Sequence, residues 1–316
     1  MEKRRLGQSD LHIAPLVFGG NVFGWTVDEA TSFILLDAFV AAGFNTIDTA
    51  DVYSTWAPGH QGGESETIIG KWLKERGGRD KVVIATKVGS DMGNGRRGLS
   101  KAYILKAVED SLRRLQTDYI DLYQSHTDDE AAPQEETAAA YATLIRQGKV
   151  RAIGASNFTA ARLASAATAC KALAHPRYES LQPCYNLYDR AGFEGELADY
   201  CIREKIGVIT YSSLAAGFLT GKYRNKQDLG KSVRGEDVEK YLDARGLRIL
   251  DALGRIAADH HVKPGQVALA WLMAQPGVTA PIASATTLPQ LHDLVAASQL
   301  PLDASAIAEL TTASAT

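Results

Sequence analysis

Four side chains in this chain, Asp48, Tyr53, Lys87 and His126, have the types needed for acid catalysis on a carbonyl group. A tyrosine hydroxyl has an unperturbed pKa of about 10 and is a poor proton donor at neutral pH. A lysine ammonium within hydrogen-bond reach stabilises the phenolate and lowers that pKa, and a carboxylate beside the lysine keeps it in place and charged. A histidine can hydrogen-bond the carbonyl oxygen, so the four together predict a general acid over a carbonyl that becomes an alkoxide. No side chain supplies a hydride, so this chemistry requires a nicotinamide cofactor.

These residues can act together only if the fold brings them to one place, and the apolar pattern predicts such a fold. Helical patterns separate most of eight short apolar or β-branched runs. Alternating strands and helices are typical of parallel βαβ units, and eight units in this length favour a closed (β/α)8 TIM barrel. The expected strands are Leu16–Phe18, Phe44–Asp48, Val82–Thr86, Tyr119–Tyr123, Arg151–Gly154, Leu181–Cys184, Gly207–Tyr211 and Ala280–Ala283.

Three local signals complete this prediction. The segment RRLGQSDLHIAP precedes the first strand and is expected to form an N-terminal hairpin that closes the barrel bottom, whereas Gly221–Tyr241, rich in Lys, Arg, Asp and Gly, is expected to be a long surface loop after strand seven. Thr26 and Glu29 match a T-x-x-E capping box at a helix start, and Gly43 is a natural helix stop because it tolerates positive φ. No linker divides the chain, so residues 1–316 are predicted to form a single barrel domain.

The active site of such a barrel lies at the carboxyl ends of its strands, so the residues just past each strand are the candidates. Most of these positions hold polar or ionisable groups, although barrel interiors prefer Val, Ile and Leu. The four catalytic candidates come from separate chain positions yet would converge on one mouth. In chain order the strand-end groups are Gly19-Gly20-Asn21, Asp48 with Tyr53 close behind, Lys87, His126, Ser156-Asn157, Gln182, Tyr211-Ser212 and Ser284.

Composition narrows the classes of protein. The net charge of −3 gives no electrostatic reason to expect nucleic acid or an acidic membrane as a partner. No apolar run is long enough to span a bilayer, the first residues lack the apolar core of a signal peptide, and the three cysteines, without CxxC spacing, indicate reduced thiols. We therefore expect a cytoplasmic protein that acts on small-molecule carbonyl or alcohol substrates, with no metal site and with its oligomeric state left open.

Several motifs, in order along nearly the whole chain, resemble the aldo-keto reductase superfamily. They are GFNTIDTADVY (43–53), ATK ending at Lys87, YQSH ending at His126, GASNF (154–158), QPCYNL (182–187), YSSLAAGFLTGKY (211–223) and PIASATTLPQL (281–291). The segment YSTWAPGHQGGESETIIGKWL is similar to the bacterial branch that also resembles the β subunits of voltage-gated potassium channels. The resemblance implies an NAD(P)-dependent oxidoreductase that reduces aldehydes or ketones, or catalyses the reverse oxidation of alcohols.

Carried over position by position, the resemblance implies that Tyr53 is the general acid, Lys87 and Asp48 are its tuning pair, and His126 orients the carbonyl. It implies a substrate pocket shaped in part by Trp25 and Trp56. Ser156, Asn157 and Gln182 would bind the nicotinamide carboxamide, and Tyr211 would stack on its ring. The remaining expected cofactor-binding residues are Gly20, Asn21, Ser212, Leu214, Ala216, Lys222, Arg234, Ser284, Thr286, Gln290 and Asp293.

The expected cofactor is NADPH, with NADH also possible, but two positions depart from the family pattern. Many members have a Lys in the segment that matches Ser284-Ala285 and an Arg where this chain has Gln290, and those cations bind the 2′-phosphate. Here the phosphate would have to be neutralised from the loop after strand seven, where the candidates are Lys222, Lys226, Lys231 and Arg234.

Other readings of the sequence compete with a reductase. Gly93–Gly98 matches G-x-G-x-x-G, but the loop that holds it is too long for the tight turn of a dinucleotide-binding fold, so we expect a flexible loop near the barrel mouth that could touch substrate. No Tyr-x-x-x-Lys, G-x-S-x-G or P-loop motif is present. The serious alternative is a barrel that binds the cofactor tightly but works mainly as a regulatory or redox-sensing partner. A metal-dependent hydrolase is a third reading.

Overall fold

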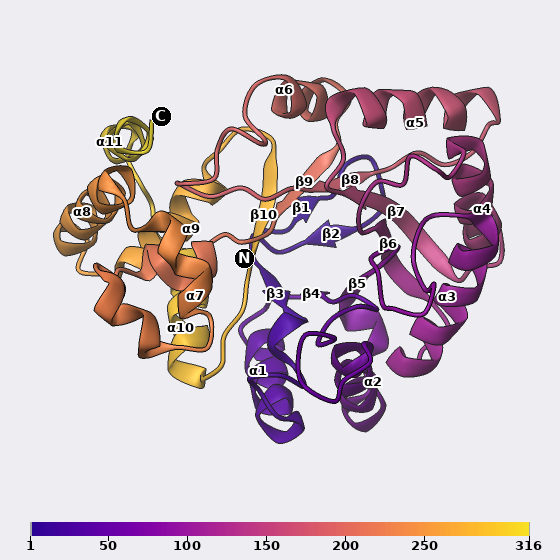
Figure 1. The fold of residues 1–316 in the computed structure, drawn as a ribbon, viewed down its shortest axis with the longest axis horizontal. Coiled ribbons are helices and arrows are strands. Elements are labelled where there is room, and N and C mark those ends of the chain that lie inside the picture. Colours follow the sequence, from indigo (N-terminus) through magenta and orange to yellow (C-terminus); the bar gives the residue numbers. More distant parts are fainter. Residues whose placement is uncertain (1, 316) are drawn as a thin grey trace.

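The computed structural model describes residues 2–315 and contains a closed barrel of eight parallel strands (Figure 1). The order around the barrel is β10-β3-β4-β5-β6-β7-β8-β9, so neighbours along the chain are also neighbours in space. This confirms the predicted (β/α)8 TIM barrel. The strands are β3 (Val17–Gly19), β4 (Thr46–Asp48), β5 (Val83–Val88), β6 (Ile120–Ser125), β7 (Val150–Ser156), β8 (Ser180–Gln182), β9 (Gly207–Thr210) and β10 (Val278–Ala283).

The N-terminal segment forms the expected hairpin, in which β1 (Arg4–Arg5) pairs antiparallel with β2 (His12–Ile13). Leu6, Leu11 and Ile13 are buried in one apolar cluster with residues that the strands send into the barrel interior. A Cβ on Gly207, the first residue of β9, would lie 2.6 Å from Leu6 Cδ1, which places the hairpin at the amino ends of the strands. The hairpin therefore closes the barrel at the end opposite the one where an active site is expected.

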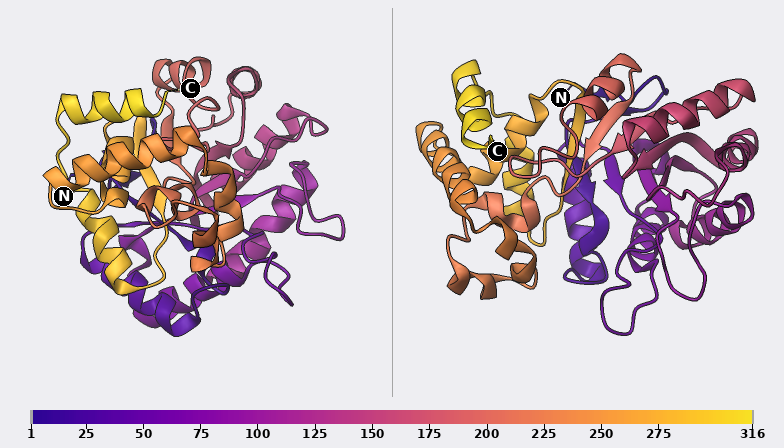
Figure 2. Two further views of the ribbon diagram at one scale, coloured as in Figure 1. Left: turned by 60° about the vertical axis from the view of Figure 1, so that its left-hand side comes forward. Right: turned by 45° about the horizontal axis from the view of Figure 1, so that its top comes forward.

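The helices pack outside the strands (Figures 1 and 2). A second, larger apolar cluster fills the layer between barrel and helices. In α3, for example, Ile104, Val108, Leu112 and Leu115 recur at helical spacing and are buried, each contributing roughly 1.5–3 kcal/mol. The helices are α1 (Glu29–Ala41), α2 (Glu64–Arg76), α3 (Lys101–Leu115), α4 (Gln134–Arg146), α5 (Ala160–Ala172), α6 (Glu196–Arg203), α7 (Gly235–Val238), α8 (Ala244–Asp259), α9 (Pro264–Met273), α10 (Leu288–Ala297) and α11 (Ala304–Ala313).

The start of α1 differs from the prediction. Asp28, not Thr26, is the N-cap, and its carboxylate accepts a hydrogen bond from the Thr31 amide at 2.8 Å. Thr26 lies two residues too early, in a turn, so the T-x-x-E match is not a capping box. The predicted stop is confirmed, since Gly43 follows the helix with a φ of +90°.

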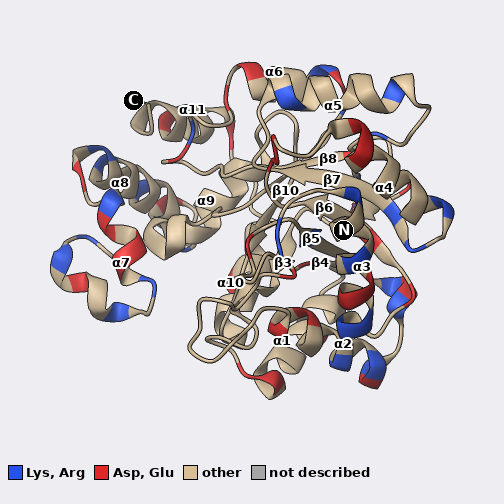
Figure 3. Ribbon diagram, turned by 45° about the vertical axis from the view of Figure 1, so that its right-hand side comes forward, with Lys and Arg blue, Asp and Glu red and all other residues tan. Residues whose placement is uncertain are grey.

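The long segment after β9, the seventh barrel strand, is only partly a loop. The chain first forms a 3-10 helix at Ala215–Thr220, and within Gly221–Tyr241 it forms α7 and two further 3-10 helices, Lys226–Lys231 and Glu239–Tyr241. The expected long connection after strand seven is present, and short helical turns form part of it. Asn225 and Asp228 form a capping box at the second of the three 3-10 helices, a signal that the Lys- and Gly-rich composition concealed. Charged residues of both signs lie along the ribbon around α7 (Figure 3).

Candidate active site

The barrel brings the four catalytic candidates to its carboxyl end. Asp48 is the last residue of β4, Lys87 lies near the end of β5, and His126 directly follows β6. Tyr53 lies in the turn after β4, five residues beyond Asp48. These three strands are neighbours in the barrel, so the four side chains meet although the chain separates them by up to 78 positions.

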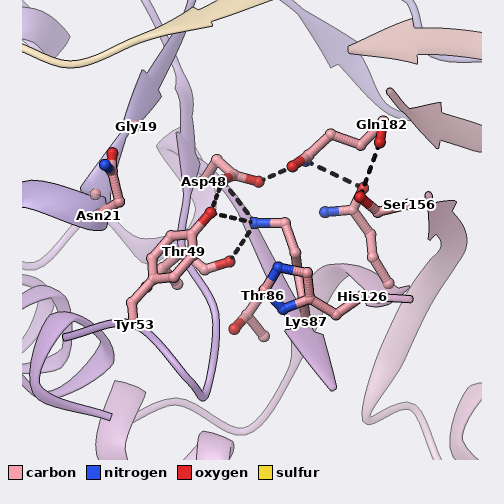
Figure 4. A network of polar contacts seen from close by, with 12 residues as sticks. Gly19, Asn21, Asp48, Thr49, Tyr53, Thr86, Lys87, His126, Ser156 and Gln182 are labelled. Atoms are coloured by element: carbon pink, nitrogen blue, oxygen red, sulfur yellow. Dashed lines mark hydrogen bonds and ion pairs between the residues drawn. The ribbon is translucent and has the colours of Figure 1, made fainter. Parts of the chain in front are cut away.

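The Lys87 ammonium is the centre of the resulting network (Figure 4). Its Nζ donates hydrogen bonds to Asp48 Oδ2 at 2.7 Å, to the Thr49 carbonyl oxygen at 2.8 Å and to Tyr53 Oη at 2.9 Å. An ammonium has three protons to donate, so every one of them has an acceptor. The side chain is wholly buried, and these contacts offset only part of the cost of removing its charge from water, since burial still lowers the pKa of Lys87. Tyr53 Oη in turn donates to Asp48 Oδ2 at 3.2 Å.

The protonation of this network differs from the expectation in one respect. Burial, together with the neighbouring Asp48 carboxylate, raises the pKa of Tyr53 well above its ordinary value of 10. The predicted lowering of the resting pKa by Lys87 is thus outweighed, because the phenol is partly buried and shares its pocket with an anion. The consequence is a phenol that keeps its proton at neutral pH. The ammonium, at hydrogen-bond distance, would stabilise negative charge on the phenol oxygen once that proton leaves.

His126 is held in its neutral form. Burial and then the Lys87 charge lower the pKa of His126 from 6.5 to about 3. Its ring lies edge-on to that of Tyr53, with 6.0 Å between the ring centroids. A neutral imidazole beside the phenol can donate or accept one hydrogen bond without competing for the proton, which suits an orienting role.

A cavity of about 1240 Å³ opens above the network, between the barrel mouth and the segment around α7. Asp48, Tyr53 and His126 line it, whereas Lys87 lies in the wall beneath. Two expected ligand-binding residues do not line it. Gly20 is buried, with its carbonyl oxygen accepting a hydrogen bond from Ser65. Trp25 contacts Trp56 edge-on, and Trp56 does line the cavity. The other expected residues that line it are Asn21, Ser156, Asn157, Gln182, Tyr211, Ser212, Leu214, Ala216, Lys222, Arg234, Ser284, Thr286, Gln290 and Asp293.

The residues expected to bind the carboxamide form one connected group beside Asp48. Gln182 Nε2 donates to Asp48 Oδ1 at 2.8 Å, and Ser156 Oγ donates to the Gln182 carbonyl oxygen at 2.8 Å (Figure 4). Asn157 has a left-handed φ of 59°, and its side-chain oxygen accepts a hydrogen bond from Tyr211 Oη at 2.8 Å. Amide and hydroxyl groups are thus gathered within reach of the catalytic carboxylate.

The backbone after β9 is strained where it borders the cavity. Ser212, Ala215 and Ala216 have φ values of 55°, 49° and 55°, in the region that non-glycine residues rarely adopt. Each such residue costs of order 1–3 kcal/mol and persists only where the surroundings impose it. The buried Asn186 side chain, which the sequence did not single out, donates to the Ser212 carbonyl oxygen at 3.0 Å and helps impose this shape.

Charged residues at the far end of the cavity differ in their partners. Lys222 lines the cavity and has no ion pair with a described residue, whereas Lys231 pairs with Asp228 at 2.7 Å. Lys226 does not line the cavity and pairs with Glu239 at 2.7 Å. Sequence reasoning missed Lys263, which lines the cavity and pairs with Asp293 at 2.7 Å.

Gln290 lies at the same end, and its side-chain oxygen accepts hydrogen bonds from both the amide and the hydroxyl of Thr286, at 2.8 and 3.0 Å. The glycine-rich Gly93–Gly98 loop, by contrast, does not line the cavity. Its Arg96 donates instead to the backbone carbonyl of Met92 at 2.7 Å.

A buried carboxyl group behind the network was also missed. Asp51 is 1% exposed, and neither of its carboxyl oxygens forms a hydrogen bond to a described residue. Burial, and then the nearby Glu66 carboxylate, raise the pKa of Asp51 to about 8, and the opposing effects of Arg114 and Lys87 offset this only in part. Glu66 itself is paired with Arg114 at 2.7 Å. In the sequence, Asp51 resembles an ordinary turn residue, so only the fold reveals its burial.

The cavity and its lining fit a nicotinamide dinucleotide. The volume accommodates a ligand of that size together with a small substrate. Amide and hydroxyl groups lie beside the acid network, Tyr211 offers an aromatic ring, and basic side chains lie at the other end. Among residues 2–315, no three His, Cys, Asp or Glu side chains are grouped as a metal would require, and no helix is both long and apolar enough to cross a membrane.

Comparisons with known proteins agree with this geometry. The model of the aldo/keto reductase family matches residues 15–315. The chain is 36% identical over 312 residues to "Uncharacterized oxidoreductase YrpG" of Bacillus subtilis, covering 96% of this chain and 93% of that protein. It is 37% identical over 276 residues to "Aldo-keto reductase YhdN" of the same organism, covering 85% and 78%. A rice protein, "Probable voltage-gated potassium channel subunit beta", is 33% identical over 296 residues, covering 90% and 88%. The chain therefore belongs to the aldo/keto reductase family and is an NAD(P)-dependent oxidoreductase.

Proposed function

We propose that this chain reduces aldehydes or ketones to alcohols with NADPH, accepts NADH less well, and catalyses the reverse oxidation with the same groups. The observation that carries the proposal is the contact of Lys87 with both Asp48 and Tyr53 at the mouth of a barrel whose cavity fits a dinucleotide. The bound nicotinamide would supply the hydride. Every other requirement of the reaction falls to side chains of this chain.

Tyr53 is the general acid in this proposal. Its high pKa keeps the proton on Oη until a carbonyl oxygen, gaining negative charge, becomes the stronger base. Lys87 then stabilises the phenolate through its 2.9 Å contact, and Asp48 holds the ammonium in position. Neutral His126 hydrogen-bonds the carbonyl oxygen and fixes its orientation toward Tyr53. In alcohol oxidation the same atoms work in reverse, with the phenolate as the base.

The rest of the cavity would hold the dinucleotide. Ser156, Asn157 and Gln182 would bind the carboxamide, and Tyr211 would lie against the ring. The strained segment from Ser212 to Ala216 would follow the pyrophosphate, since left-handed backbone turns point amide groups into a concavity that suits anions. Ser284, Thr286 and Gln290 would contact the adenosine end, and Lys222, which has no ion pair with a described residue, is the cation best placed for a 2′-phosphate.

The test follows absorbance at 340 nm with NADPH and then NADH, against 4-nitrobenzaldehyde and methylglyoxal. Tyr53→Phe is the matched variant, because it removes only the hydroxyl. General acid catalysis contributes about 10²–10⁴-fold, so we expect the variant to lose at least that factor while its NADPH affinity changes little. Unchanged turnover in Tyr53→Phe would refute the assignment. Tight NADPH binding with one slow turnover and retained cofactor would instead support a regulatory or redox-sensing partner.

A further inference from the structure

The chain between β9 and α8 lines the cavity, and both of its ends contact one short turn. We call residues 212–241 the covering segment, because it includes the strained backbone from Ser212 to Ala216 and supplies a large share of the residues that line the cavity. The turn, residues 186–189, follows β8 and is called the anchor turn; it contacts Ser212 at one end of the covering segment and Tyr241 at the other. A segment that binds a ligand is placed only as well as the residues that support it.

Asn186, the first residue of the anchor turn, is wholly buried and uses every hydrogen-bonding position of its side chain. Its Oδ1 accepts hydrogen bonds from the backbone amides of Tyr188 and Asp189, each at 2.8 Å, which closes the turn on itself. Its Nδ2 donates to Asp189 Oδ2 at 2.9 Å and to the Ser212 carbonyl oxygen at 3.0 Å. A buried amide with four partners specifies one arrangement, so Asn186 fixes the beginning of the covering segment relative to the turn.

The Asp189 carboxylate connects the same turn to the other end of the covering segment. Its Oδ2, which already accepts the hydrogen bond from Asn186, also accepts one from Tyr241 Oη at 2.7 Å. Tyr241 is buried, and its ring contacts those of Phe218 and Tyr188, with 5.4 and 4.9 Å between the centroids. One carboxylate oxygen is thus bonded to the end of the covering segment and, through Asn186, to its beginning.

We propose that Asn186 and Asp189 are positioning residues for the cofactor, which set its affinity and its release rate by holding both ends of the covering segment. Neither residue lines the cavity, so they act only through Ser212 and Tyr241. This rests on the proposed function, in which the backbone from Ser212 to Ala216 follows the pyrophosphate. Because the anchor turn holds that backbone in its binding shape beforehand, less conformational entropy is lost when the dinucleotide binds.

The test is Tyr241→Phe, which removes only the hydroxyl group that reaches Asp189. Fluorescence titration and stopped-flow displacement measure the Kd and the dissociation rate of NADPH and of NADH. A hydrogen bond to a charged group changes an equilibrium constant by roughly tenfold to a hundredfold. The contact of Tyr188 Oη with Asp243 at 3.0 Å remains, so we expect both quantities to rise by about tenfold. The factor is the same for the two cofactors, which share the pyrophosphate, and it appears in the KM for the cofactor, whereas kcat at saturating cofactor does not fall.

Tyr185→Phe is the matched control. Tyr185 follows the same strand, its hydroxyl donates to Glu194 at the same distance of 2.7 Å, and neither of the two lines the cavity. This variant should lower Tm to an extent similar to that of Tyr241→Phe but leave both Kd values unchanged. Asp189→Ala should weaken both cofactors by at least about tenfold, whereas Asp189→Asn keeps an acceptor oxygen and should stay within about threefold of the wild type.

Four outcomes would overturn the proposal. Unchanged Kd values in Tyr241→Phe show that the contact does not position the cofactor, although turnover of an aldehyde by the wild type leaves the reductase proposal standing. Equal losses of affinity in Tyr241→Phe and Tyr185→Phe show an effect of general stability alone. A loss for NADPH but not for NADH assigns the effect to the 2′-phosphate end. A wild-type protein that binds neither cofactor counts against the proposed function itself and removes the basis of this proposal.

Discussion

Replacing Asp51 with Asn should make the protein more stable, and the gain should grow with pH. Asp51 is buried without a hydrogen-bonding partner among the described residues, and its pKa is raised from an ordinary value of 3.8 to about 8. Between these two values the unfolded chain carries the charge and the folded chain carries the proton. Each pH unit in that window therefore costs the folded state about 1.4 kcal/mol.

The magnitude follows from the width of the window. The penalty is about 2 kcal/mol near pH 5 and reaches about 6 kcal/mol above pH 8, where both states are ionised. Asn has nearly the same shape and no charge, so Asp51→Asn removes the penalty at both values. The advantage of the variant should thus grow by about 4 kcal/mol between roughly pH 5 and pH 8.5. For 316 residues this corresponds to about 6 °C in Tm.

The assay is thermal unfolding of both proteins, followed by circular dichroism at those two pH values. Glu66→Gln is the control, because Glu66 is equally buried but is paired with Arg114 and accepts a hydrogen bond from Thr86 at 2.6 Å. It should lose stability at both values, since Arg114 is left without its partner. A gain in Asp51→Asn that is independent of pH, or a loss that grows with pH, would show that the carboxyl group is not buried in the way described.

The remaining predictions concern activity and cofactor. Lys87→Met should lower kcat by about 10²–10⁴-fold, because nothing then stabilises the Tyr53 phenolate. The variant also leaves the buried Asp48 carboxylate without its ion pair, which lowers stability. Adding Asp48→Asn should restore stability in thermal unfolding but not activity in the kinetic assay. With the pKa of His126 near 3 and that of Tyr53 well above 10, kcat/KM for reduction should be flat from about pH 5 to 7, below the pKa of Asp51 of about 8, and a step near the ordinary histidine pKa would contradict this. Gln290→Arg should tighten NADPH but not NADH by roughly tenfold or more in a fluorescence titration; equal affinities would mean that position 290 does not face the 2′-phosphate.

The barrel and the catalytic network could be predicted from sequence for one physical reason. In a parallel barrel the strand ends meet, so residues far apart in the chain, such as Asp48 and Lys87, are brought together by topology alone. Local signals were less reliable. Thr26 and Asp28 are both good capping residues, and the sequence offers no measure of which one faces the free amides of α1.

What the sequence could not supply is burial and the absence of partners. The pKa of Asp51 depends on residues 15 and 63 positions away, Glu66 and Arg114, which no local pattern connects to it. Arg234 was singled out as a cation, but its contact with Trp25 emerges only from how the segment after β9 folds over the cavity. The charge of a side chain can be read from the sequence, whereas its burial and its contacts depend on the fold.

The complete enclosure of the Lys87 ammonium also determines how that residue meets chemical reagents. Acylating and alkylating reagents attack a deprotonated, accessible amine, and Lys87 in the folded molecule is neither exposed nor free of acceptors. Its modification requires that the barrel mouth opens first, so the rate at which label accumulates on this lysine measures how often it opens. Labelling of Lys87 therefore also measures whether the fold around the active site is intact.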